Sequence, residues 1–156
     1  MDVSCLELKI PPPIWMVLHV LLEYGISTVN DTFTFSGNWR FVGAAVIGII
    51  GVLFIGSGIT LFRNAGTTPS PLEPERSSAL VTSGVYQITR NPMYVGLLFL
   101  LLASGAALGD GVAIVVGPIL FAVIITRLQI IPEERALRST FGEEYVTYTQ
   151  RTRRWL

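Results

Sequence analysis

The sequence has little of what cross-links a small soluble domain. It contains one cysteine, Cys5, and one histidine, His19. A lone cysteine cannot form a disulfide within the chain, and no group of cysteines and histidines has the spacing of a zinc site. We therefore expect neither a disulfide framework nor a bound metal.

Charged residues are also scarce. They make up 14% of the 156 residues, against 51% hydrophobic residues, and the formal net charge is zero. The mean hydropathy is +0.57, which is uncommon for a soluble domain of this size. The basic residues form no extended patch of the kind that nucleic acid requires, and the sequence has neither a phosphate-binding glycine loop nor a nucleophile elbow. These absences argue against a nucleic-acid partner and against the common soluble-enzyme templates.

Long apolar segments stand in place of these features. Residues 41–62 form 22 consecutive positions without a formal charge, and at about 1.5 Å rise per residue they span the roughly 30 Å hydrocarbon core of a bilayer. Residues 93–109 and 112–131 flank the turn Gly109-Asp110-Gly111 and predict a tight hairpin of two further membrane helices. With an N-terminal segment, these runs predict an all-α integral membrane protein, one domain over residues 1–156 with about four transmembrane helices.

The N-terminal segment, residues 14–30, is the first predicted membrane helix. His19 and Glu23 interrupt it four residues apart, so they share one helical face, which we expect to point into the bundle. In the helix over residues 41–62, small residues recur at three- and four-residue steps or their sum and predict a face that a neighbouring helix approaches closely. These small residues are Ala44, Gly48, Gly51 and Gly58.

The arginines predict how the chain is oriented. Nine of the eleven basic residues lie within residues 63–90 and 127–154, whereas the hairpin tip carries only Asp110. Cytoplasmic segments close to membrane helices are rich in Lys and Arg. We therefore expect a cytoplasmic loop over residues 63–91 and a cytoplasmic tail over residues 132–156, with the N-terminus on the same side.

The first part of this tail is predicted to be helical. Pro132 suits a first helical position, and Glu133 and Glu134 suit the first turn, where the helix dipole favours acidic side chains. Gly142 is a candidate site for a kink. The helix also presents an apolar and aromatic stripe along one face. Its members are Leu137, Phe141, Tyr145 and Tyr148.

Two motifs bring polar side chains to the predicted membrane surface. The first consists of LVTSGVY, residues 80–86, and RNPMYVG, residues 90–96, and it leads from the cytoplasmic loop into a membrane helix. A purely structural explanation is available, in which Asn91 caps the helix, Pro92 begins it and Arg90 sets the topology. A polar binding surface is the other explanation, and this motif alone does not separate the two.

The second motif is EERALRSTFGEEYVTY, residues 133–148, in which acidic side chains lie beside the aromatic stripe. Such a surface suits a cationic, aromatic ligand. The structural alternative is that the glutamates complement the helix dipole and that Glu134 pairs with Arg138 four residues on, each effect contributing a few tenths of a kcal/mol.

Taken together, the two motifs resemble the isoprenylcysteine carboxyl methyltransferase family, which is broadly related to the membrane phospholipid methyltransferases. The resemblance covers about residues 58–156 and rests on two separate motifs in the right order on either side of a helical hairpin. It implies that the cytoplasmic loop and the C-terminal region enclose S-adenosylmethionine, which is converted to S-adenosylhomocysteine. It also implies a lipophilic acceptor that arrives from the bilayer, either an isoprenylcysteine-like carboxylate or a phospholipid.

Matching the motifs position by position implies a set of site residues. Arg90 and Arg127 become candidate catalytic residues, which would orient a reacting carboxylate. Methyl transfer from a sulfonium is a direct displacement that depends on alignment and desolvation, so the lack of a catalytic triad is no objection. The implied cofactor contacts are Tyr86, Arg90, Asn91, Pro92, Tyr94, Gly96, Glu133, Glu134 and Tyr145.

The chain departs from the eukaryotic members of that family. Asn91 stands where their motif has histidine, and the chain is much shorter, which makes it similar to the bacterial members and implies a bacterial plasma membrane. Two other classes of function stay open. One is a small proton-coupled transporter that uses Glu23, because intramembrane acids serve such transport. The other is a membrane scaffold without catalytic activity.

Overall fold

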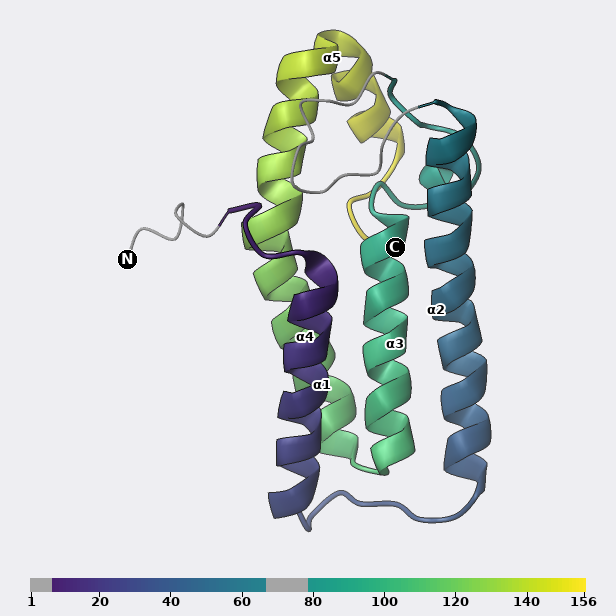
Figure 1. Cartoon of the computed structure of the whole chain (residues 1–156), viewed down its shortest axis with the longest axis vertical. Helices are drawn as coiled ribbons and strands as arrows, with labels where there is room; N and C mark the ends of the chain where they lie inside the picture. The colour runs from purple at the N-terminus through teal and green to yellow at the C-terminus, as the bar shows by residue number, and fades with distance from the viewer. Residues whose placement is uncertain (1–6, 67–78) are drawn as a thin grey trace.

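The computed structural model describes residues 7–66 and 79–156, and within them the chain is built from helices (Figure 1). The predicted all-α class is confirmed. Four long helices stand side by side, and part of the predicted cytoplasmic loop lies outside the described residues. The elements are α1 Pro12–Val29, α2 Trp39–Asn64, η3 Gly84–Gln87, α3 Pro92–Leu108, α4 Gly111–Ile125, η4 Thr126–Ile130 and α5 Ile131–Arg151.

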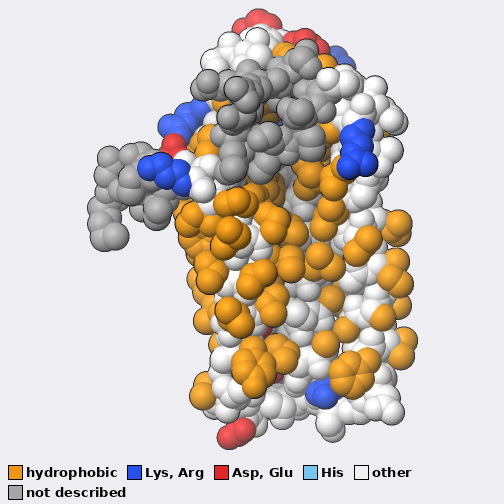
Figure 2. Space-filling view, viewed as in Figure 1, with side chains coloured by type: hydrophobic (Ala, Val, Ile, Leu, Met, Phe, Trp, Pro, Cys, Tyr) orange, Lys and Arg blue, Asp and Glu red, His pale blue; other side chains and the backbone are white. Residues whose placement is uncertain are grey.

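The surface of the bundle identifies a membrane protein. Both α2 and the continuous helix over Gly111–Arg151 are long and apolar enough to cross a bilayer, while α3 is apolar but shorter. Only 11% of the apolar stretch of α2 is buried, although a core helix of a soluble protein would be covered. Figure 2 shows hydrophobic side chains over the middle of one face, with charged side chains toward its two ends. The count of four spans stays a prediction.

Small residues let α2 and α3 pack with their backbones almost touching, as the spacing of glycines in α2 predicted. A Cβ atom added at Gly51 would lie 2.7 Å from the carbonyl oxygen of Gly96, and one added at Gly96 would lie 2.6 Å from the carbonyl oxygen of Gly51. Ala44 and Gly58 are buried along the same face of α2. This packing fixes the start of α3 against the second half of α2.

The hairpin tip is held by a polar cluster at the end of the bundle opposite α5. Gly109 ends α3 in the left-handed conformation, with φ 77°, which glycine adopts without steric cost. Asp110 caps α4 by accepting a hydrogen bond from the Ala113 backbone amide at 2.8 Å. Its other carboxylate oxygen accepts one from Asn30 Nδ2 at 2.7 Å, which ties the end of α1 to the hairpin.

The polar face of α1 points into the bundle, as predicted. Glu23 is completely buried and His19 is 4% exposed. The Glu23 carboxyl is hydrogen-bonded to the Ser104 hydroxyl of α3 and lies against Gly117 of α4, where an added Cβ atom would collide with it. His19 Nδ1 lies 2.7 Å from the carbonyl oxygen of Trp15 in its own helix.

At the other end, α4 continues through the π-helical turn η4 into α5, and Pro132, the second residue of α5, does not break the helix. The predicted kink at Gly142 is confirmed, because this residue has φ 52° and ψ −125° inside α5. The chain beyond Gly142 turns over the top of the bundle and ends close to the start of α3 (Figure 1). Because of the kink, the segment after Gly142 covers the end of the bundle that carries both sequence motifs.

Candidate functional site

A cavity of about 310 Å³ lies beneath this cover, within the size range of small-molecule sites. Its walls come from the start of α1, the second half of α2, η3, the start of α3 and both halves of α5. One part of the lining is polar. Its members are Tyr86, Arg90, Asn91, Tyr94, Glu133, Glu134, Tyr145 and Tyr148.

The structure brings most of the predicted site residues to this cavity. Tyr86, Arg90, Asn91, Pro92, Tyr94, Glu133, Glu134 and Tyr145 all line it. They come from segments far apart in the sequence, which meet because α5 folds back over the start of α3.

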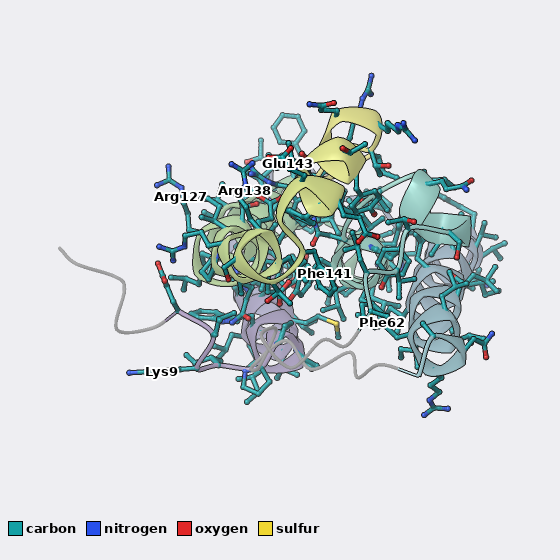
Figure 3. All side chains as sticks on the ribbon, turned by 90° about the horizontal axis from the view of Figure 1, so that it is seen from above. Lys9, Phe62, Arg127, Arg138, Phe141 and Glu143 are labelled. Atoms are coloured by element: carbon teal, nitrogen blue, oxygen red, sulfur yellow. The ribbon has the colours of Figure 1, made fainter. Side chains whose placement is uncertain are left out.

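Two predicted site residues lie elsewhere. Gly96 faces α2, where any side chain would meet the backbone of Gly51, so it serves helix packing. Arg127 lies in η4 with an exposed side chain, and Figure 3, which looks down on the α5 end, shows it directed away from the bundle. The prediction singled out Arg127 for its position at the membrane edge, and that position does not bring it into the cavity.

The start of α3 is built differently from a simple capped helix. Asn91 occupies the N-cap position, but its side chain makes no capping hydrogen bond. Instead Asn91 Nδ2 donates to the carbonyl oxygen of Arg154 at 2.9 Å, and the Asn91 amide donates to Thr89 Oγ1 at 3.2 Å. The side chain of Asn91 therefore joins the C-terminal segment to the cavity wall.

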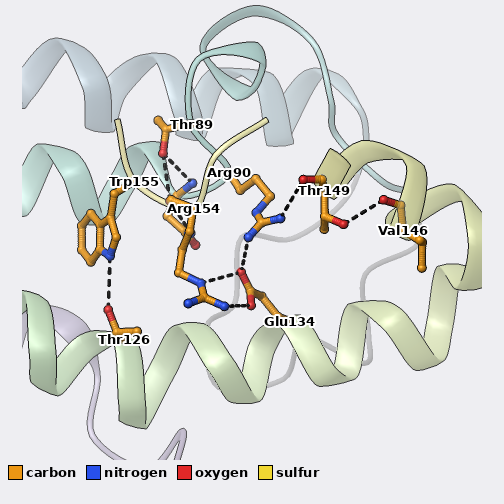
Figure 4. A network of polar contacts seen from close by, with 9 residues as sticks. Thr89, Arg90, Thr126, Glu134, Val146, Thr149, Arg154 and Trp155 are labelled. Carbon is orange, nitrogen blue, oxygen red and sulfur yellow. Dashed lines mark hydrogen bonds and ion pairs between the residues drawn. The ribbon is translucent and has the colours of Figure 1, made fainter. Parts of the chain in front are cut away.

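An ion-pair network forms the charged wall of the cavity (Figure 4). Arg90 Nη2 donates to Glu134 Oε1 at 2.8 Å. Arg154 holds both oxygens of the same carboxylate, with Nε 3.0 Å from Oε1 and Nη2 2.6 Å from Oε2. Bidentate pairs of this kind are stronger and better oriented than single ones. Within the described residues Glu134 pairs with these two arginines, and the exposed pair with Arg138 is not formed.

Glu133 has a different environment from its neighbour. The Tyr94 hydroxyl donates a hydrogen bond to its carboxyl group. Burial raises the pKa of Glu133 to about 8, and the charge of Glu134 adds to the rise, whereas the hydrogen bond from Tyr94 opposes it. Near neutral pH this carboxyl can therefore take up or lose a proton when a charged ligand arrives.

Two polar atoms of the cavity lining have no hydrogen-bond partner within the described residues. Tyr86 Oη and Arg90 Nε are buried and make no hydrogen bond within the described part of the chain. Burial raises the pKa values of the Tyr86 and Tyr145 phenols, so both stay neutral at physiological pH. The Tyr148 hydroxyl donates to the carbonyl oxygen of Tyr86 at 2.7 Å. Because unpaired buried polar groups are costly, Tyr86 Oη and Arg90 Nε are suited to bind a ligand.

The other part of the cavity is apolar. Ile55 and Ile59 of α2 and Leu97 of α3 line it toward the middle of the bundle, and Pro12 and Pro13 line it at the start of α1. The cavity therefore joins a charged, aromatic end to an apolar end that points along the membrane helices. The arrangement can hold an amphipathic molecule, or two molecules of different polarity side by side.

The sequence did not reveal the role of three residues that build or support the site. Arg154 and Thr89 gave no sequence signal, because their role depends on the return of the chain after Gly142. Tyr148 was recognised on the aromatic stripe, but only the structure shows that it lines the cavity and holds the backbone at Tyr86.

Comparison with known proteins gives a consistent result. A family model described as phospholipid methyltransferase matches residues 39–144. An uncharacterized protein of Haemophilus influenzae is 47% identical over 64 residues, which are 41% of this chain and the whole of that protein. Protein-S-isoprenylcysteine O-methyltransferase B of Arabidopsis thaliana is 40% identical over 80 residues, which are 49% of this chain and 39% of the plant protein. The match thus spans well under half of the plant protein's length.

Proposed function

The chain belongs to the phospholipid methyltransferase family, and on this premise we propose that it transfers the methyl group of S-adenosylmethionine to a lipophilic acceptor held in the membrane. The observation that carries the proposal is the cavity whose polar end holds an arginine, two glutamates and four tyrosines while its apolar end runs along α2 and α3. A methyl donor that is polar and charged and an acceptor that is lipophilic need these two environments in contact.

The residues at the polar end suit the groups of this cofactor. Arg90 lines the cavity with an unpaired Nε and is suited to bind a carboxylate. Glu133 is suited to accept hydrogen bonds from an ammonium group or from ribose hydroxyls, and tyrosine faces are suited to pack on adenine or near a sulfonium. When bound, S-adenosylmethionine supplies an electrophilic methyl group on a positively charged sulfur.

The protein contributes to the reaction by aligning the acceptor with the methyl group and by excluding water from the site. In a direct displacement from a sulfonium the positive charge disappears, so alignment of the acceptor and removal of water matter more than acid–base catalysis. The apolar side chains of Ile55, Ile59 and Leu97 lie where they would exclude water from an acceptor. Arg90 is placed to orient an acceptor carboxylate if the cofactor does not occupy it.

The apolar end supports an acceptor that enters from the bilayer. The cavity is lined by the start of α1 and by α2, and these two helices pack on α3 rather than closely on one another. The acceptors that fit are a carboxylate on an isoprenylcysteine-like group, methylated on oxygen, and a phospholipid. The cationic Arg90 favours the carboxylate over an ammonium headgroup on electrostatic grounds.

The orientation we propose follows from the same end of the molecule. The arginines of the network and the exposed Arg63, Arg127 and Arg138 lie at the α5 end of the bundle, which by the positive-inside rule is cytoplasmic. S-adenosylmethionine would therefore reach the site from the cytoplasm, in a bacterial plasma membrane.

Calorimetric titration of the full chain in detergent with S-adenosylmethionine and S-adenosylhomocysteine tests the proposal. We expect saturable binding that Arg90→Ala weakens strongly and that the exposed Arg151→Ala leaves at the wild-type level. Transfer of a labelled methyl group is then measured with an N-acetylated farnesylcysteine and with phosphatidylethanolamine as acceptors. Absence of binding in folded protein, repeated with lipid present, would overturn the proposal and favour transport through Glu23 or a scaffold.

A further inference from the structure

Residues 152–156 lie behind the cavity wall and support it through their backbone. The Arg90 amide donates to the carbonyl oxygen of Arg153 at 2.9 Å. Thr89 Oγ1 and Asn91 Nδ2 both donate to the carbonyl oxygen of Arg154, at 3.1 and 2.9 Å. The segment is thus paired with the start of the RNPMYVG motif.

The side chain of Trp155 anchors the same segment on its other side. Its Nε1 donates to Thr126 Oγ1 at 3.2 Å, and its ring packs against the core formed by Tyr94, Leu101, Phe121, Ile125 and Ile130. Arg154 lies between these two anchors, so its backbone has little freedom to move. The guanidinium is consequently presented to Glu134 from a fixed point.

Resting on the proposed function, we infer that Arg154 is a positioning residue of the cofactor site, which holds the Glu134 carboxylate so that the Arg90 guanidinium stays turned toward the cavity. Arg154 is not itself among the residues that line the cavity. It occupies both oxygens of Glu134, whereas Arg90 makes a single contact to Oε1. Arg90 Nη1 also donates to the carbonyl oxygen of Thr149 at 3.4 Å, so within the described residues it is Nε of Arg90 that has no partner and is available to a ligand.

Removing Arg154 would change how the Glu134 carboxylate is shared between the two arginines. One carboxylate and one guanidinium left together favour a bidentate pair, so Glu134 would draw Arg90 into the geometry that Arg154 now occupies. The Arg90 side chain, which is 12% exposed in the present arrangement, would then be withdrawn from the cavity. Loss of a hydrogen bond between the charged Arg90 and a ligand would weaken binding about tenfold to a hundredfold.

Arg154 also has an electrostatic effect on the neighbouring acid. Glu133 is faced by Glu134 of its own helix, by Tyr94 of α3, by Tyr86 of η3 and by Tyr145 of α5. The negative charge of Glu134 raises the pKa of Glu133, and the Arg154 guanidinium, which contacts both oxygens of Glu134, compensates that charge. Loss of Arg154 should therefore move the titration of Glu133 to higher pH.

The test is calorimetric titration of the full chain with S-adenosylmethionine between about pH 6 and 8.5, for wild type, Arg154→Ala, Arg154→Lys and the exposed control Arg151→Ala. If binding requires ionised Glu133, affinity falls up to about tenfold per pH unit below its pKa. We expect Arg154→Ala to bind about tenfold to a hundredfold more weakly and to shift the midpoint of this pH profile upward. Arg151→Ala should match wild type in both respects.

Arg154→Lys separates the geometric effect on Arg90 from the electrostatic effect on Glu133. It also tests the positioning role if the alanine variant does not fold. Lysine keeps the charge but not the two-pronged geometry, so we expect the wild-type midpoint with weaker binding. Wild-type affinity in Arg154→Lys, or an Arg154→Ala profile that coincides with wild type in folded protein, would overturn the positioning role. No binding by the wild-type protein would instead overturn the proposed function.

Discussion

Acidic side chains are shielded from solvent in the middle of the bundle and at its α5 end, fully at Glu23 and partly at Glu133 and Glu134, and their surroundings differ. In the middle of the bundle, Glu23 meets the Ser104 hydroxyl and the backbone at Gly117, and it does not line the cavity. At the α5 end, Glu133 and Glu134 meet a tyrosine and two arginines beside open space. A buried acid enclosed by neutral groups joins neighbouring helices, whereas acids with cations and space beside them can bind a ligand.

The two regions also differ in how their helices pack. Around Glu23 and along the α2–α3 contact, glycines allow backbones and side chains to approach without gaps. At the cavity, the larger side chains of Phe62, Tyr86 and Tyr148 hold the elements apart, with the Phe62 and Tyr86 rings edge to face at 5.4 Å. The packed region therefore sets stability, and the cavity region gives up some packing for binding.

The largest effect should come from the charged wall of the cavity. Glu134→Ala leaves two guanidiniums facing each other without a carboxylate, which costs roughly 3–5 kcal/mol for a buried network, less here because Arg154 is partly exposed. We expect S-adenosylhomocysteine binding to be lost in calorimetry, while Glu23→Gln binds as wild type. Loss of binding in Glu23→Gln, with the fold intact by circular dichroism, would contradict the division between the two regions.

The next effect concerns the bundle alone. Glu23→Ala removes a buried side chain and its hydrogen bond with Ser104, whose hydroxyl keeps the Leu101 carbonyl oxygen as a partner, so we expect a loss of about 2–4 kcal/mol of stability, mainly from the cavity that is left. Glu23→Gln keeps the volume and can still donate to the serine oxygen, so it should lose much less. Thermal unfolding in detergent measures both. Equal thermal midpoints for the alanine and glutamine variants would show that Glu23 has no packing role.

Gly96 offers a test of the same kind at the helix contact. Gly96→Ala would place a methyl group 2.5 Å from Ile55 Cγ1 and 2.6 Å from the Gly51 carbonyl oxygen, and such overpacking costs about 1–3 kcal/mol. Gly25→Ala is the matched control, because nothing lies within 4 Å of the added atom. We expect a lower thermal midpoint for Gly96→Ala only, with cofactor affinity of the folded protein unchanged. Reduced cofactor affinity in Gly96→Ala, with the thermal midpoint of the wild type, would show that Gly96 contributes to the binding site.

The last effect is the pH dependence of stability from Glu133. Its pKa rises from 4.5 to about 8 in the folded protein, so between these values the folded state binds more protons than the unfolded state. The stabilisation is complete below about pH 4.5 and is lost as the pH rises toward about 8. We expect the thermal midpoint of the wild type to fall over this window and that of Glu133→Gln to fall less. Parallel curves would show that Glu133 is ionised in the folded protein throughout.

The sequence alone was sufficient for the helical class, the inward face of α1, the small-residue face of α2 and the kink at Gly142. Each of these is local, because the 3.6-residue period fixes which side chains share a face and glycine marks where the backbone can leave the helix. The family motifs also identified eight residues that line the cavity, although spacing by itself left their structural explanations open.

Only the tertiary structure decided which of these residues work together. Arg154 lies 20 positions from Glu134 in the sequence, and Arg90 lies 44 positions from it, so no helical period relates the three. Their contact depends on the angle at which α5 turns back at Gly142 and on the anchoring of Trp155. In the same way, Gly96 and Arg127 matched what a site requires in type and position, but the packing of α3 on α2 and the rotation of η4 turn them away from the cavity. Side-chain direction between elements is set by packing across the whole bundle, which a linear pattern does not contain.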